Sequence, residues 1–204
     1  MITVVDYGTG NLASIANMLK KIGCASAITS DAKEIGRATK LILPGVGAFD
    51  TGMRNLHALG LTEMLNRKAQ EERVPVLGIC LGMQLFVSSS EEGDLPGLGW
   101  IDGRVVKFKS ELAEGLKVPH MSWNHIDAVK ESKLFAGMYE DPRFYFVHSY
   151  HVQLDREEDL LATTTYGYPF ASAVEKENIA GVQFHPEKSH KFGMKLLRNF
   201  AEMY

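Results

Sequence analysis

The chain has 204 residues, of which 45% are hydrophobic and 23% charged, so it can bury a sizeable core as one domain spanning residues 1–204. A net charge of −3 gives no electrostatic reason to expect a nucleic acid or membrane partner. The first six residues lack a signal-peptide pattern, and no apolar run has the roughly 18 residues of a membrane span. The two cysteines, Cys24 and Cys80, are too few for a disulfide framework. We therefore expect a cytoplasmic protein.

Strands and helices alternate through the first ninety residues. Strands are predicted at residues 2–6, 25–29, 41–43 and 75–79. A helix capped by Gly10 or Asn11 follows the first strand and ends at Gly23, and Ser30-Asp31 caps a short second helix. Helical periodicity extends from Met53 to Arg73. Strands joined by helical crossovers predict a parallel sheet that is covered on both faces.

The pattern changes after about Glu91, where short strands with turn residues between them replace the alternation. These strands are expected at 105–108, 126–129, 144–147, 160–165 and 170–174. Residues 171–175 and 179–184 should form a hairpin, and a final amphipathic helix carries Phe192, Leu196 and Phe200. The expected fold is therefore α/β: a mostly parallel central sheet with helices on both faces and a smaller antiparallel sheet region.

Cys80 lies in the most informative segment of the chain, Gly78-Ile79-Cys80-Leu81-Gly82. An apolar run ends there in Gly-x-Cys-x-Gly, the pattern of a nucleophile elbow with sulfur in place of the usual serine hydroxyl. The glycines remove side chains that would crowd a sharp strand-to-helix turn. The alternative is an inert, buried cysteine of the kind common in protein cores.

Downstream, His185-Pro186-Glu187 offers a base and a carboxylate to orient it. Proline fixes an extended turn, so residues 185 and 187 project to the same side just beyond the last predicted strand. We therefore predict a triad in which Cys80 is the nucleophile, His185 the base and Glu187 its orienting group. A surface His and Glu after a strand end would be the alternative.

A third element is the glycine-rich loop Pro44-Gly45-Val46-Gly47, which follows a buried strand. Parallel sheets place such loops at the carboxyl ends of their strands, the edge where Cys80 is also expected. Backbone N–H groups of Gly45, Val46 and Gly47, with that of Leu81, are candidates for an oxyanion hole. An ordinary tight loop is the alternative.

Two other motifs fail. Residues 7–12 begin like a dinucleotide fingerprint, but Ala13 stands where the third glycine should be. His148-Ser149-Tyr150-His151 has metal-like spacing only on a helix, whereas here it ends an aromatic strand. We expect neither a cofactor nor a metal.

The loop after residue 43, the segment around Cys80 and the run Phe184–Ser189 resemble, in order, the three signature regions of class I glutamine amidotransferases. Within that family the chain is similar to the glutaminase subunits of imidazole glycerol phosphate synthases. The closer likeness rests on four further segments: residues 6–12, Val118–Asn124, Tyr145–Tyr150 and Leu196–Phe200.

The resemblance implies that L-glutamine is hydrolysed to glutamate and ammonia through a thioester on Cys80. It also implies that Gln84, Glu92 and His148-Ser149-Tyr150 hold glutamine, and that the oxyanion pocket forms fully only when a liganded partner is docked. That partner would be a (βα)8-barrel cyclase in a heterodimer, contacted by Trp123, Asn124, Tyr145 and Lys188. The chain itself shows no phosphate loop for the ammonia acceptor.

Thr9, Ala13 and Ser122 depart from the family's commonest pattern, as does the tail after Ser189. These departures leave open a paralogue that supplies ammonia for amidation of a surface-polysaccharide sugar. A non-catalytic regulatory relative and a stand-alone cysteine amidase are further alternatives. The intact Cys80-His185-Glu187 set argues against the first of these two, and Gln84 with Trp123-Asn124 argues against the second.

Overall fold

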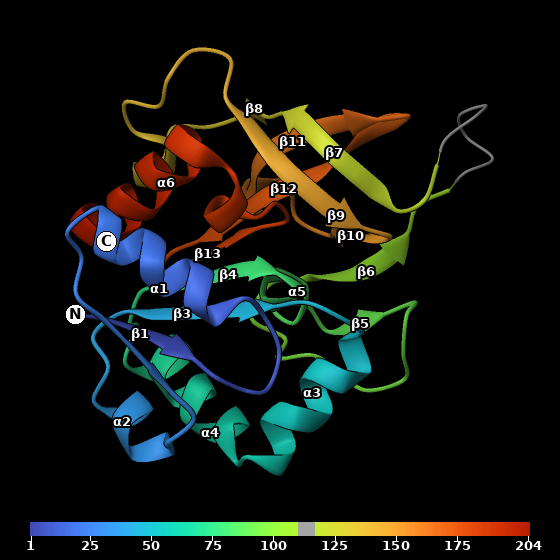
Figure 1. The fold of residues 1–204 in the computed structure, drawn as a ribbon. Coiled ribbons are helices and arrows are strands. Elements are labelled where there is room, and N and C mark those ends of the chain that lie inside the picture. Colours follow the sequence, from blue (N-terminus) through green and yellow to red (C-terminus); the bar gives the residue numbers. More distant parts are fainter. Residues whose placement is uncertain (110–116) are drawn as a thin grey trace.

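The structure, a computed structural model, describes residues 1–109 and 117–204 and is built around one long, twisted sheet (Figure 1). In these residues the strand order is β2-β1-β3-β4-β13-β12-β10-β6-β5, with β11 beside β12 and β8 beside β11. The strands are β1 Ile2–Val5, β2 Ser26–Thr29, β3 Leu41–Gly45, β4 Val76–Cys80, β5 Ser89–Ser90, β6 Gly103–Lys107, β8 Asp127–Ala128, β10 Tyr150–Leu154, β11 Leu160–Tyr166, β12 Tyr168–Lys176 and β13 Ile179–Val182.

The half of the sheet from β2 to β13 is parallel, and from β12 onward most pairs are antiparallel. Two further strands, β7 (His120–His125) and β9 (Arg143–His148), form a separate antiparallel sheet. The predicted fold class is confirmed: a mainly parallel central sheet accompanied by a smaller antiparallel one.

Helices cover both faces of the parallel half (Figure 1). The α-helices are α1 Leu12–Lys21, α2 Ala32–Gly36, α3 Phe49–Ala58, α4 Leu61–Asn66, α5 Leu81–Gln84 and α6 His190–Met203, with a π-helical turn at Arg67–Glu71 and 3₁₀ turns at Lys133–Phe135, Glu157–Asp159 and Pro186–Lys188. Helices α1 and α6 lie on one face and α2, α3 and α4 on the other. Each face has its own buried apolar core, and Cys24 packs against the core on the α1 side.

Capping residues set the first two helix starts as expected. The Asn11 side chain accepts a hydrogen bond from the Ser14 N–H at 3.3 Å, so Asn11, and not Gly10, caps α1. Asp31 caps α2 by accepting from the N–H groups of Lys33 and Glu34.

The helical pattern predicted from Met53 to Arg73 divides into α3, α4 and the π-helical turn. Helix α3 begins earlier, at Phe49. Gly60 adopts the left-handed conformation (φ 65°) between α3 and α4, which interrupts the hydrogen-bond ladder. The prediction located the helical region correctly but missed this break.

Strands β7 and β10 were not predicted as strands. Strand β7 begins after Pro119 with His120 buried and Met121 exposed, and its histidines and asparagine conceal the alternation. The aromatic strand expected at 144–147 continues to His148, and β10 begins two residues later. The predicted hairpin is confirmed as β12–β13, although β13 ends at Val182 and not at Phe184.

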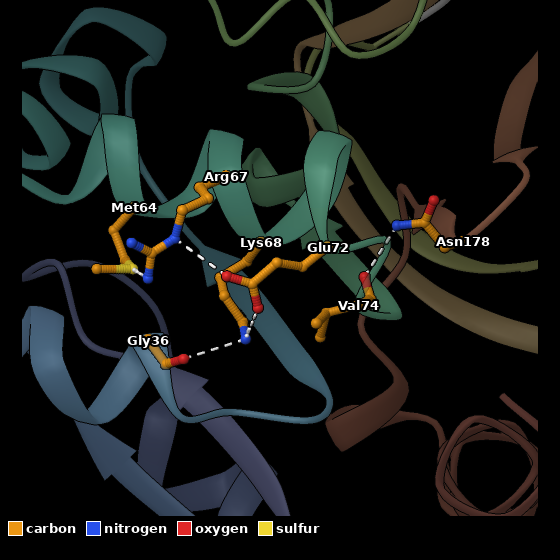
Figure 2. Close-up of polar contacts among 7 residues, drawn as sticks. All are labelled: Gly36, Met64, Arg67, Lys68, Glu72, Val74 and Asn178. Atoms are coloured by element: carbon orange, nitrogen blue, oxygen red, sulfur yellow. Dashed lines mark hydrogen bonds and ion pairs between the residues drawn. The ribbon is translucent and has the colours of Figure 1, made fainter.

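Lys68, a buried lysine in the π-helical turn that precedes β4, links this turn to α2 (Figure 2). Lys68 donates to the carbonyl of Gly36 at 3.1 Å and pairs with Glu72 at 2.5 Å. Glu72 also pairs with Arg67, and Asn178 donates to the carbonyl of Val74. The pairing satisfies a buried charge that would otherwise destabilise the fold.

Candidate active site

Cys80 is the last residue of β4 and precedes α5 directly. Its backbone has φ 53° and ψ −109°, a strained conformation for a residue with a side chain, and it is 6% exposed. A Cβ on Gly82 would collide with the carbonyl of Leu43, and one on Gly78 would lie 2.6 Å from the Phe86 ring. The glycines are therefore needed as the elbow interpretation predicted.

The two parallel neighbours of β4 bring the other predicted groups to Cys80. On one side, Gly45 at the end of β3 is in register with Cys80. On the other side, Val182 at the end of β13 pairs with Ile79, so the chain continuing to His185 passes the elbow. Motifs about 35 and 105 residues from Cys80 in sequence thus meet at one sheet edge because parallel strands share their carboxyl ends.

His185 and Glu187 form a buried pair behind the elbow. Nδ1 of His185 donates to Glu187 Oε1 at 2.8 Å, and the two side chains are 2% and 1% exposed. Burial alone would lower the pKa of His185, but its interactions with Cys80 and Glu187 raise it to about 10. Nε2, the other ring nitrogen, has no oxygen or nitrogen partner among the described residues, and the interaction with Cys80 is the one left to it. Because Cys80 and Glu187 raise the pKa of His185, its imidazole is protonated beside the cysteine at neutral pH.

A pocket of about 410 Å³ opens over Cys80. Its walls include all five residues predicted to hold glutamine, together with three of the four oxyanion candidates: Gln84, Glu92, His148, Ser149, Tyr150, Val46, Gly47 and Leu81. Gly45, the fourth candidate, does not line the pocket, and a Cβ there would collide with the Tyr7 hydroxyl and the Leu81 side chain. The structure therefore brings the predicted nucleophile, loop and polar groups together at one cavity.

Two of the polar pocket residues also make internal contacts. Glu92 accepts a hydrogen bond from the Phe49 N–H at 2.9 Å and so caps α3, whose own N-cap residue, Ala48, offers no side-chain oxygen. Gln84 donates to the carbonyl of Tyr150 and to Gln183 Oε1, both at 3.0 Å. In Gln84 both amide hydrogens are therefore engaged, and within residues 1–109 and 117–204 no donor to its Oε1 is found.

His148 is held by a neighbouring histidine. Its Nδ1–H donates to the Tyr150 carbonyl at 2.7 Å, so its Nε2 accepts from His120 Nδ1 at 3.1 Å. Burial lowers the pKa of His148 to about 3 and that of His120 to about 4. Both rings are therefore neutral at physiological pH, in fixed tautomers.

The model of the family "glutamine amidotransferase class-I" matches residues 3–203 of the chain. The chain belongs to this family. The amidotransferase is 56% identical over 202 residues to a Methanococcus maripaludis protein named imidazole glycerol phosphate synthase subunit HisH 2, covering 99% of each chain. It is 49% identical to proteins named as subunits HisH 2 and HisH of the same synthase in Pseudomonas aeruginosa and Bdellovibrio bacteriovorus, covering 100% of each chain.

Solved structures support the same fold for this amidotransferase. A protein described as a glutamine amidotransferase superposes with a TM-score of 0.74 at 19% identity, covering 99% of this chain and 98% of the other. A putative GMP synthase component from Thermoplasma acidophilum gives a TM-score of 0.72 at 21% identity, covering 98% of this chain and 91% of the other.

Of the four residues that the sequence predicts at a partner interface, three lie together in the structure. Trp123 is 42% exposed and stacks on His190 with ring centroids 5.4 Å apart, and Tyr145 lies edge-on to it. The Lys188 ammonium lies 5.5 Å from the Tyr145 ring centroid. Asn124 differs, since its side chain turns inward and donates to the Thr165 carbonyl.

Sequence reasoning missed Gln183 and Ser189, both fully buried beside the triad. Gln183 Nε2 lies 3.6 Å from Cys80 Sγ. Ser189 donates to the carbonyl of His185 and accepts from the Tyr145 N–H, which fixes the His185 backbone. The one available signal was spacing, because Gln183 precedes His185 by two residues and shares its side of an extended chain.

Within residues 1–109 and 117–204, no group of three or more potential ligand side chains is arranged to hold a metal ion. None of the helices in the same residues is long and apolar enough to span a membrane.

Proposed function

We propose that the chain is the glutaminase subunit of an imidazole glycerol phosphate synthase and supplies ammonia for histidine biosynthesis. Support comes from the full-length identity of about half to subunits of that name, from Cys80 in the wall of a pocket, and from the buried His185–Glu187 pair that interacts with it. The single observation that carries the chemistry is Cys80 at a strained elbow beside an imidazole whose pKa is raised to about 10.

In this proposal Cys80, as thiolate, attacks the carboxamide carbon of glutamine. The carbonyl electrons move to oxygen, which the N–H groups of Leu81 and the Gly45–Gly47 loop stabilise. The tetrahedral intermediate collapses, the C–N bond breaks, and protonated His185 gives its proton to the leaving nitrogen, releasing ammonia. Glu187 keeps Nδ1 as the donor of its hydrogen bond, so that Nε2 faces the reaction.

The thioester is then hydrolysed. His185, now neutral, removes a proton from water, whose oxygen attacks the thioester carbonyl. The C–S bond breaks, glutamate leaves, and the thiolate and imidazolium are restored. In the pocket Gln84, Glu92 and the His148–Tyr150 segment hold the substrate, and Gln84 Oε1 faces no donor from the part of the chain that the structure describes.

A partner is part of the proposal because ammonia released into water near pH 7 is mostly protonated and no longer nucleophilic. The partner is a (βα)8-barrel cyclase in a heterodimer, and it contacts the surface formed by Trp123, Tyr145 and Lys188. An exposed tryptophan stacked on a neighbouring ring is a typical anchor of a protein interface. Asn124 would contribute indirectly, through the position of β7.

The test is glutamate release from glutamine by the chain alone, with the cyclase subunit of the same organism, and with the cyclase plus its nucleotide ligand. Strong stimulation by the liganded cyclase, abolished by Cys80→Ala, is the expected result. Hydrolysis that persists in Cys80→Ala would refute the assignment of the nucleophile. Wild-type binding to the cyclase without stimulation would refute the gating of the oxyanion pocket, and no binding would point to a different acceptor, such as the surface-sugar pathway.

A further inference from the structure

A chain of hydrogen bonds ends on the sulfur of Cys80 and contains no member of the triad other than this sulfur. It runs from the Tyr150 carbonyl through the side chains of Gln84 and Gln183 to Cys80 Sγ. Gln183 is fully buried and Gln84 is 5% exposed, so water does not compete for these contacts. Two buried glutamines in contact are costly unless their polar groups are satisfied.

The orientation of both side-chain amides follows from the Tyr150 carbonyl, where this series of hydrogen bonds begins. A backbone carbonyl can only accept, so Gln84 must present its NH₂ group to Tyr150. The second hydrogen of that group points to Gln183, 3.0 Å away, which must therefore present Oε1. Gln183 is left with its NH₂ group toward Cys80, at an N–S separation of 3.6 Å.

The same carbonyl also accepts from His148. Both lone pairs of the Tyr150 oxygen are therefore used, and the His120–His148 contact holds the second donor in place. Neutral groups with fixed donor and acceptor roles thus determine which end of each glutamine amide faces Cys80.

We propose that Gln183 is a further catalytic residue: its side-chain N–H stabilises the Cys80 thiolate, and Gln84 is the positioning residue that keeps this donor aimed at sulfur. This inference rests on the proposed function. When sulfur attacks glutamine its negative charge passes to the carbonyl oxygen, and the N–H···S contact weakens. When water later attacks the thioester, the C–S bond breaks and sulfur takes the electron pair, which the Gln183 donor stabilises again.

The experiment measures the rate at which iodoacetamide alkylates Cys80 as a function of pH, in a Cys24→Ser background. Gln183→Met keeps the length of the side chain and removes the donor. We expect the pH midpoint of alkylation to rise by about one unit or more, since hydrogen bonds to charged groups are among the stronger ones. Gln183→Glu should raise it further, because a carboxylate would then face the thiolate.

Gln153→Met is the matched control, since Gln153 is an exposed glutamine on β10, and it should leave the midpoint unchanged. Gln84→Met should raise the midpoint less than Gln183→Met, and the double variant should shift no further than Gln183→Met alone. An unchanged midpoint in folded Gln183→Met would overturn the proposal. If that variant does not fold, an unchanged midpoint in Gln84→Met overturns it.

The outcome is separable from that of the proposed function. Wild type that hydrolyses glutamine in the complex while the Gln183 variants keep its alkylation profile refutes only the role of Gln183. Wild type that hydrolyses no glutamine in the complex, yet shows the Gln183-dependent shift, refutes the glutaminase assignment.

Discussion

Replacing Cys80 by alanine should sharply lower the pKa of His185. Burial opposes protonation of this imidazole, while Cys80 and Glu187 favour it and raise its pKa from 6.5 to about 10. That difference corresponds to a preference for the protonated ring of about 5 kcal/mol. Without Cys80 the ring keeps its burial and its 2.8 Å contact with Glu187, so its pKa should fall by about one unit or more.

The assay is NMR of ¹⁵N-labelled histidine, with the His185 signals assigned by comparison with His185→Asn. Wild type should keep His185 protonated through pH 8, and Cys80→Ala should bring its titration into a lower range. Cys24→Ala is the control and should change nothing, because Cys24 packs against the core near α1. A wild-type His185 that titrates near 6.5, or one whose titration is unaffected by Cys80→Ala, would refute the coupling.

Four further outcomes are expected. Glu187→Gln should lower glutaminase kcat in the complex by about 10²–10⁴, because the imidazole loses its orienting charge, and an unchanged kcat would contradict its role. Burial lowers the pKa of His120 to about 4, so the folded state loses stability as the pH falls from 6.5 to 4. His120→Phe should therefore reduce the dependence of the free energy of unfolding on pH in this range by up to about 1 kcal/mol per pH unit, measured by urea unfolding. The hydrogen bond from Lys68 lowers the pKa of Glu72, so the stability that this pair contributes is present above pH 4.5 and is lost as the pH falls through the lowered pKa. The difference in melting temperature between wild type and Glu72→Gln should therefore disappear at low pH. A difference independent of pH would contradict this pairing. Trp123→Ala should lower the melting temperature of the isolated chain only slightly, through the lost stacking on His190, and weaken cyclase binding by about tenfold or more in calorimetry. Unchanged affinity would place the interface elsewhere.

The elbow and the pairing of His185 with Glu187 were predictable because their determinants are local. Glycines at 78 and 82 are required by contacts within one strand-to-helix turn, and Pro186 fixes the relation of His185 to Glu187. Parallel strands share their carboxyl edge, and this rule predicted that the elbow, the Gly45–Gly47 loop and His185-Pro186-Glu187 lie side by side.

The role of Gln183 was not predictable because it depends on register between strands far apart in sequence. Its contact with Gln84 requires β13 beside β4 and β10 nearby, and a lone glutamine before an aromatic residue carries no signal of either. Glu92 is a similar case: its contact with the Phe49 N–H follows from the loop before β6 passing the start of α3.

The strands β7 and β10 escaped prediction for a related reason. In each strand a buried position is held by a histidine, His120 in β7 and His151 in β10, beside Val152 in β10. Their rings pack against Phe108, Phe146 and Tyr166, so an apolar–polar alternation is not visible in the residue types. Only the folded structure shows that these histidines are neutral members of an aromatic core.

The most direct test of the account is to trap the acyl-enzyme. The complex with the liganded cyclase would be mixed with isotopically labelled glutamine, quenched in acid within milliseconds and digested for mass spectrometry. The account predicts a glutamyl group on the peptide containing Cys80, and none in Cys80→Ala. Label on another residue, or burst release of ammonia with Cys80 unmodified, would contradict it.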